Sequence, residues 1–142
     1  NGATFEFGFE TGPTLSESTD GDSLPDVWEN LNGLSSNDPN GINGDLGNPE
    51  KDRFNNLEEF ILGLSPLASD HYQPGIVKTL SGAQLTFTTI PDRWYRVFYS
   101  DDLVTWFPLT SDILGTGSSQ TINDTTPETE RFYHVKVRLL AP

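Results

Sequence analysis

Apolar and polar residues alternate at both ends of the chain. In the first ten residues, Phe5, Phe7 and Phe9 alternate with polar residues or glycine, which is the period of a β-strand. From residue 76 on, short alternating runs are separated by turns rich in Gly, Pro, Asp and Ser. These runs predict strands over 76–80, 84–90, 94–100, 105–109, 120–123 and 132–140.

Short, closely spaced strands predict a β-sandwich of the immunoglobulin or fibronectin type. Within the strand 94–100, Tyr95, Val97 and Tyr99 share one face, and in 132–140 the alternate residues from Tyr133 to Leu139 do the same. We expect these faces to form the core.

The strand at the start of the chain has three Phe on one face, so it needs a sheet edge to cover it. Three alternatives remain open. The strand folds back onto its own sheet, it adds to the sheet of a neighbouring copy in a head-to-tail filament, or it belongs to a preceding domain.

Between these β regions, the pattern changes to the helical period. One short helix is predicted after Pro25, since proline favours a first helical position. A second is predicted to end at Gly63. The apolar faces of the two helices are Val27, Trp28 and Leu31 in the first and Leu57, Phe60 and Ile61 in the second.

Charge is concentrated in the same region. The chain of 142 residues has a net charge of −13. Of its 21 acidic residues, 14 precede residue 71, together with only two of its eight basic residues. This balance argues against binding to nucleic acid or anionic lipid. With no Cys, the chain has no disulfide, thiol nucleophile or thiolate site, so a bound metal is expected to be a hard cation on oxygen ligands.

The first acidic segment has the spacing of an EF-hand calcium loop, read from residue 18. Such a loop takes oxygen ligands from positions 1, 3, 5 and 9, a carbonyl from position 7 and a bidentate Glu from position 12. Position 6, where a glycine is usual, is Ser23. The predicted calcium ligands are Ser18, Asp20, Asp22, the carbonyl of Leu24, Asp26 and Glu29.

The same frame recurs 30 residues later, from residue 48. This copy has fewer carboxylates, and Lys51 and Arg53 lie among them. Its predicted ligands are Asn48, Glu50, Asp52, the carbonyl of Phe54, Asn56 and Glu59, with Asp45 as an additional oxygen. One or two Ca²⁺ ions are therefore expected. Neither loop has a convincing entering helix, so each is predicted to be half of an EF-hand.

The segments Asp20-Gly-Asp-Ser-Leu-Pro-Asp-Val-Trp-Glu and Asn56-Leu-Glu-Glu-Phe-Ile-Leu-Gly-Leu-Ser-Pro-Leu resemble thrombospondin type 3-like calcium repeats, which are similar in layout to dockerin half EF-hands. The resemblance covers residues 18–70 and implies calcium-dependent structure outside the cell without catalysis. The second copy lacks the first Asp and both glycines of the usual pattern. Residues 76–140 resemble the C-terminal β domains that follow such repeats in secreted proteins of planctomycete- and verrucomicrobia-type bacteria.

The predicted organisation is mainly β with a small helix-containing calcium module. Its parts are a strand at 1–10, a linker at 11–17, the calcium module at 18–70, a linker at 71–75 and the sandwich at 76–142. The chain lacks the usual nucleophile, phosphate-loop and zinc motifs, so we expect no catalysis.

The favoured function is a secreted or surface-exposed structural or adhesive protein, joined to copies of itself by the strand that contains Phe5, Phe7 and Phe9. The alternative is a carbohydrate-binding or spacer module of a secreted polysaccharide-degrading enzyme. In that case Trp94 or Trp106 is the residue that stacks on the sugar. No apolar run is long enough to span a membrane.

Overall fold

The structure is a computed structural model that describes residues 5–10, 17–69, 74–126 and 130–140, the first of these ranges by its backbone alone. It is mainly β, with two sheets and two short helices. Contacts divide the chain into two compact units. We call residues 1–10 and 72–138 the sheet unit, and residues 11–71 and 139–142 the loop–helix unit. Of the linkers predicted at 11–17 and 71–75, residues 11–16 and 71–73 lie outside the described residues.

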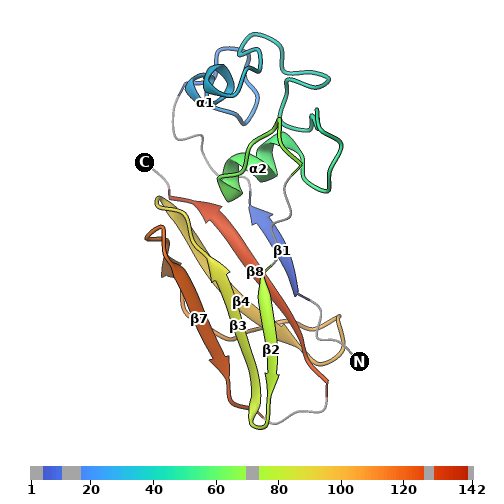
Figure 1. The fold of residues 1–142 in the computed structure, drawn as a ribbon, viewed down its shortest axis with the longest axis vertical. Helices are drawn as coiled ribbons and strands as arrows, with labels where there is room; N and C mark the ends of the chain where they lie inside the picture. Colours follow the sequence, from blue (N-terminus) through green and yellow to red (C-terminus); the bar gives the residue numbers. More distant parts are fainter. Residues whose placement is uncertain (1–4, 11–16, 70–73, 127–129, 141–142) are drawn as a thin grey trace. The chain divides into compact units, whose positions relative to one another are not determined.

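The sheet unit contains two sheets (Figure 1). In the larger sheet, β8 (Phe132–Leu139) lies between β1 (Phe5–Glu10) and β4 (Arg93–Ser100), and β4 also pairs with two short strands. These are β5 (Phe107–Pro108) and β6 (Ile113–Leu114). The smaller sheet has the order β2 (Gly75–Thr79), β3 (Gly82–Thr88), β7 (Ser119–Asp124), all antiparallel.

Alternation along the strands builds the core between the sheets. The ring of Phe87 on β3 lies 5.7 Å from the ring of Tyr95 on β4, so the two sheets meet face to face as in a sandwich. Tyr95 is buried, and its hydroxyl accepts a hydrogen bond from the backbone N–H of Ile90 at 2.8 Å. The predicted core faces are confirmed apart from Tyr99, which is only partly buried. The buried residues of the two sheets include Ala83, Leu85, Val97, Tyr133, Val135, Val137 and Leu139.

The strand predicted over 105–109 is reduced to two residues, because a tight turn occupies the segment before it. The Asp102 carboxylate accepts hydrogen bonds from the backbone N–H groups of Val104 and Thr105, at 2.8 and 2.7 Å. Leu103 has a φ of 64°, a left-handed conformation that interrupts strand pairing. The pattern missed β6, since two residues are too few to show a period.

The first strand pairs with its own chain in this structure. β1 runs parallel to β8, with Phe7 opposite Val135 and Phe9 opposite Val137 in the register. The first of the three alternatives is therefore the arrangement present. A β1 strand from a neighbouring copy could pair with β8 only by displacing the chain's own β1.

Removing residues 1–10 tests this pairing. We expect the full chain to sediment as a monomer, and the truncated chain to melt at a lower temperature because the outer edge of β8 loses its partner. Analytical ultracentrifugation and circular dichroism measure the two effects. A full chain that forms oligomers, and becomes monomeric when truncated, would instead show that β1 pairs with a neighbouring copy.

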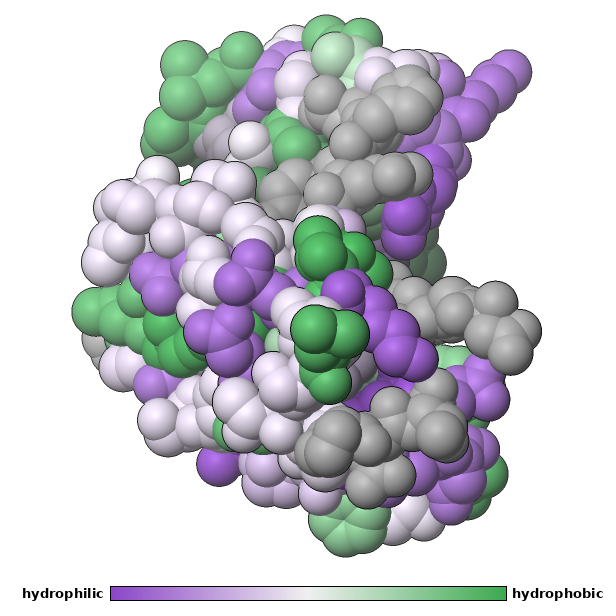
Figure 2. Space-filling model, turned by 60° about the horizontal axis from the view of Figure 1, so that its bottom comes forward, coloured by the Kyte–Doolittle hydropathy of each residue, from purple (hydrophilic) through white to green (hydrophobic). Residues whose placement is uncertain are grey.

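Apolar side chains are not confined to the core. On the face drawn in Figure 2, they lie in separate patches among polar residues. The large exposed apolar residues of the sheet unit are Val77, Leu80, Leu103, Val104, Phe107 and Leu114. Scattered exposure of this kind is ordinary for a protein surface. Among the described residues, no helix is long and apolar enough to cross a membrane.

The loop–helix unit contains α1 (Asp26–Leu31) and α2 (Asn56–Leu62). Asn55 caps α2 in a capping box with Glu58, and Gly63 ends it with a φ of 68°. Phe60 and Ile61 are buried as predicted, and Leu57 is partly buried.

The predicted apolar face of α1 is wrong. Val27 and Leu31 are 63% and 81% exposed, and only Trp28 packs inward, with its ring 5.5 Å from that of Phe60. The reason is that α1 turns its acidic side toward the interior of the unit: the one residue that the helix buries completely is Glu29.

Candidate metal centre

Three carboxylates meet in the first loop. Asp20, Asp22 and Glu29 each place an oxygen within 4.8 Å of the others. Glu29 has no exposed surface, and neither of its carboxylate oxygens has a hydrogen-bond partner. The Oδ2 atoms of Asp20 and Asp22 are likewise buried without one. Buried polar atoms are almost always paired, and these three carboxylates could hold a metal ion.

The second loop repeats this arrangement. Glu50, Asp52 and Glu59 also bring carboxylate oxygens within 4.8 Å of one another, and Glu59 is fully buried. Asn56, the predicted ligand at position 9, is fully buried as well. Its Oδ1 has no hydrogen-bond partner.

The two loops have the same local structure, residue by residue. The Asp at position 5 accepts a hydrogen bond from the backbone N–H two residues on, at 2.7 Å for Asp22 to Leu24 and 2.7 Å for Asp52 to Phe54. After each helix, the backbone N–H five residues beyond the last Glu of the loop donates to that Glu's carbonyl at 2.9 Å. The loops are thus a structural repeat, and the buried Leu24 and Phe54 occupy equivalent places.

The tight turn lies at position 4 of each loop. Gly21 and Lys51 have φ values of 81° and 61°, whereas Ser23 and Arg53 at position 6 are not in the left-handed region. The glycine that is usual at position 6 is not required in this chain, because the left-handed turn falls two residues earlier. Lys51 adopts this conformation at the cost that any non-glycine residue bears there.

The structure does not bring every predicted ligand into a cluster. Asp26 lies outside the carboxylate group of the first loop, since its carboxylate accepts hydrogen bonds from the backbone N–H and the hydroxyl of Thr19. Ser18 donates to Asp20 at 3.2 Å. In the second loop, the Asn48 side chain bonds to the backbone carbonyl and N–H of Asp52, at 2.9 and 3.2 Å, and so closes the turn.

The segment 42–47 links the two loops. Asp45, expected at the second loop, acts on the first: its charge and a backbone hydrogen bond both shift the pKa of Asp22. Its carbonyl also accepts from the backbone N–H of Leu57, at the start of α2. The amide of Asn56 donates to the carbonyls of residues 42–44, the shortest bond being 2.8 Å to Gly44. Gly47 packs so closely here that a Cβ would lie 2.7 Å from Asn56 Nδ2.

Burial and mutual repulsion disfavour the ionised carboxylates of the first cluster. Burial, and then the charges of Asp22 and Asp20, raise the pKa of Glu29 to about 7. Burial is also the largest cause of the raised pKa of Asp22. A divalent cation would remove both penalties by stabilising the ionised carboxylates.

These shifts predict opposite pH dependences with and without calcium. A carboxyl whose folded-state pKa lies above its unfolded value favours the folded state only while it is protonated. The calcium-free protein should therefore lose stability as pH rises from about 4.5 to about 7. With calcium, stability should rise over the same window, because the ion binds the ionised form. Melting temperatures at pH 5 and pH 7.5, each with calcium and with EDTA, measure this. A parallel trend in both series would contradict it.

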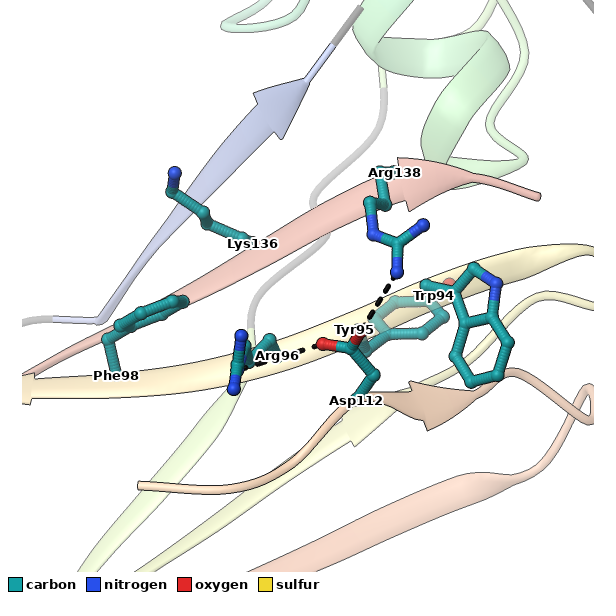
Figure 3. Close-up of a pocket in the computed structure, with 7 residues that line it drawn as sticks. All are labelled: Trp94, Tyr95, Arg96, Phe98, Asp112, Lys136 and Arg138. Atoms are coloured by element: carbon teal, nitrogen blue, oxygen red, sulfur yellow. Dashed lines mark hydrogen bonds and ion pairs between the residues drawn. The ribbon is translucent and has the colours of Figure 1, made fainter. Parts of the chain in front are cut away.

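The two tryptophans considered for sugar binding occupy different settings. Trp94 lines a pocket on the sheet unit (Figure 3). The ring of Trp106 instead packs edge-on against His134, with centroids 5.6 Å apart, and is not part of that pocket.

Comparison of the chain with protein-family models, with curated proteins and with solved structures gives no match. The likeness to thrombospondin type 3 and dockerin repeats therefore rests on the sequence pattern alone.

Proposed function

We propose that this chain is a non-catalytic, extracellular structural module whose two acidic loops bind Ca²⁺. The observation that carries the proposal is Glu29, a fully buried carboxylate with no hydrogen bond to either oxygen. The same position of the second loop holds Glu59, which is buried to the same degree. In this proposal the ions take the place that a large apolar core has in other domains.

Calcium fits these loops better than other common ions. The donors are carboxylate, amide and carbonyl oxygens, which exclude the nitrogen and sulfur ligands that zinc favours. Calcium accepts six to eight ligands in flexible geometry, and a bidentate Glu at position 12 supplies two of them. Magnesium requires a compact octahedral set of ligands and usually keeps several bound waters. A site closed by a buried Glu has little space for those waters.

The expected affinity for calcium indicates where the protein would work. Each cluster unites three carboxylates rather than the larger set of a tight intracellular site. Fewer charges give weaker binding, and modules with dissociation constants near 10⁻⁴–10⁻³ M are filled only outside the cell. The burial of Glu29 and Glu59 also argues against catalysis by these groups, because a substrate cannot reach them.

Calorimetric titration of the Glu29→Gln variant tests the proposal. We expect the wild-type chain to bind two Ca²⁺ ions, and Glu29→Gln to lose binding at the first loop while it keeps the second. Glu17→Gln is the matched control, since it removes the same charge from an exposed side chain of the same unit. Binding that is absent in the wild type, or lost equally in both variants, would refute the proposal.

A further inference from the structure

The loop–helix unit contains a chemical feature separate from the carboxylate clusters, which is asparagine followed by glycine. This pair occurs at residues 1–2, 32–33, 40–41 and 43–44. The first copy lies outside the described residues. In such a pair the backbone nitrogen of the glycine can attack the side-chain amide of the asparagine, because glycine has no Cβ to hinder the approach. The three described copies have different surroundings, and these surroundings decide which of them can react.

Asn40 is the least restrained of the three. Both Asn40 and Gly41 are exposed. The backbone of Asn40 is ordered, since its N–H donates to Asp38 at 3.3 Å and its carbonyl accepts from the N–H of Asn43 at 3.3 Å. Within the described part of the chain, its side chain forms no hydrogen bond, and neither does the N–H of Gly41. The attacking nitrogen and the amide carbon can therefore approach each other without first losing a partner.

The turn at residues 40–43 explains why a glycine follows Asn40. The hydrogen bond from the Asn43 N–H closes a β-turn in which Gly41 is the first central residue. Gly41 has a φ of 62°, which glycine adopts without the steric cost of a Cβ. A Cβ placed there would meet no described atom within 4 Å, apart from its chain neighbours. The turn thus places a reactive pair in open space.

Asn43 is held at both ends of its side-chain amide. Its Oδ1 accepts from the N–H of Ser35 at 3.2 Å, and its Nδ2 donates to Asp38 at 3.0 Å. Gly44 is buried, and a Cβ on it would collide with the carbonyl of Pro39. The Gly44 nitrogen can reach the Asn43 amide only after both side-chain hydrogen bonds break within a packed turn.

Asn32 is held in a different way, at the C-terminal end of α1. Its Nδ2 donates to the carbonyl of Trp28 at 2.8 Å, and the nitrogen of Gly33 donates to the carbonyl of Asn30 at 3.4 Å. Here both the amide and the attacking nitrogen have partners. Of three pairs with the same local sequence, the fold therefore leaves one in a state that can react.

We propose that Asn40 is a site of spontaneous deamidation in the folded protein. The Gly41 nitrogen forms a bond to Cγ of Asn40, the bond from Cγ to Nδ2 breaks, and the side-chain nitrogen leaves as ammonia with the proton from Gly41. Water then opens the resulting cyclic imide at either of its carbonyl carbons, which gives aspartate or isoaspartate at residue 40. The reaction needs no oxidant, reductant or enzyme.

The reaction changes the loop in two ways. It replaces a neutral amide by a carboxylate close to Asp38, in a unit that is already acidic. In the isoaspartate product, the main chain also gains a methylene group just before residues 42–44, whose carbonyls accept hydrogen bonds from the Asn56 amide. The modification is irreversible, and its backbone change reaches the segment that holds Asn56 in place.

Peptide mapping of aged protein tests the assignment. The full chain is kept at neutral pH in buffer with calcium and then digested after glutamate at mildly acidic pH, where deamidation is slow. The three described pairs lie together in fragment 30–50, and mass spectrometry of this fragment assigns each deamidated position. We expect Asn40 to react about tenfold faster than Asn43 and Asn32, or more, since two hydrogen bonds must break at each of those sites.

Two controls separate the effect of the fold from that of the local sequence. Asn40→Gln keeps an amide at this exposed position, but its longer side chain closes the ring far more slowly. It should abolish deamidation at residue 40 and leave Asn32 and Asn43 unchanged. In denaturant, the three pairs of the wild-type chain should react at similar rates.

Three outcomes would overturn the proposal. The first is a reaction at Asn43 or Asn32 as fast as that at Asn40 in the folded protein. The second is an Asn40 that stays intact for as long as the denatured chain needs to react. The third is the same preference for Asn40 in the folded and the denatured chain, which would mean that the surroundings of the three pairs have no influence.

Discussion

Removal of calcium should unfold the loop–helix unit while the sheet unit remains folded. Without ions, each loop holds three carboxylates whose oxygens lie within 4.8 Å of one another, and one of the three is the buried Glu at the end of the loop. A ligand present at 100 times its dissociation constant stabilises a fold by about 2.7 kcal/mol per site. Two such sites supply about 5 kcal/mol, which equals the whole stability of a marginal domain.

The tryptophans make this measurable. Trp28 belongs to the loop–helix unit, and Trp94 and Trp106 to the sheet unit. In a Trp94→Phe, Trp106→Phe variant, fluorescence reports only Trp28, whose ring lies 5.5 Å from that of Phe60. Excess EDTA should shift this emission to the red at room temperature, and calcium in excess should restore it. Strand signals in the far-ultraviolet circular dichroism of the wild type should persist.

Magnesium serves as the control for ionic strength and charge. It should restore the Trp28 signal only at much higher concentration, because its octahedral geometry fits the buried Glu poorly. An unchanged melting curve in EDTA would show that the loops fold without ions. Restoration by magnesium and calcium at equal concentration would show that general charge screening is enough.

Sequence spacing predicts which carboxylates of each loop lie together. Positions 3, 5 and 12 of both loops are the residues that the structure brings together, since these positions depend only on local loop geometry. The side chain of Asp26 departs from the pattern because Thr19, seven residues earlier, holds its carboxylate. Asp45 is predicted to belong to the second loop, but its charge and a backbone hydrogen bond act on Asp22 of the first loop. No local pattern encodes an interaction between residues so far apart in the sequence.

In the fold, too, local features are predicted from the sequence and long-range ones are not. Period-2 alternation predicts the long strands and the core faces of β4 and β8, because burial on one side of a sheet imposes that pattern. Alternation does not predict the order of the strands in a sheet. The parallel pairing of β1 with β8, for example, joins strands from opposite ends of the sequence. The wrong face of α1 follows from reading apolar residues as buried, whereas Glu29 takes the inner position instead.

Replacement of Asp124 by Asn should destabilise the sheet unit strongly. Asp124 is 4% exposed. It accepts from Arg131 Nη1 at 2.7 Å and from the Tyr133 hydroxyl at 3.0 Å. Burial alone would raise its pKa, but these bonds and one from the backbone of Thr126 hold the pKa below its usual value. Asn keeps the shape and removes the charge, so Arg131, whose side chain is only 10% exposed, loses its buried partner.

Breaking a buried ion pair costs about 3 kcal/mol or more, which for a unit of this size lowers the melting temperature by about 10 °C or more. Asp101→Asn is the matched control, because Asp101 pairs with the same Arg131 at 2.9 Å but is 55% exposed, and surface pairs contribute about 1 kcal/mol at most. Since a lowered pKa adds stability that is lost as pH falls, the wild type should also be more sensitive to acid than Asp124→Asn.

The loss should be the same in calcium and in EDTA, because Asp124, Arg131 and Tyr133 all belong to the sheet unit. Calorimetry in both buffers therefore separates the two contributions to stability: the proposed ions in the loop–helix unit, and the buried ion pair with an apolar core in the sheet unit. Equal effects of Asp124→Asn and Asp101→Asn would mean that burial adds nothing to this pair. An effect present only in EDTA would mean that the two units do not unfold independently.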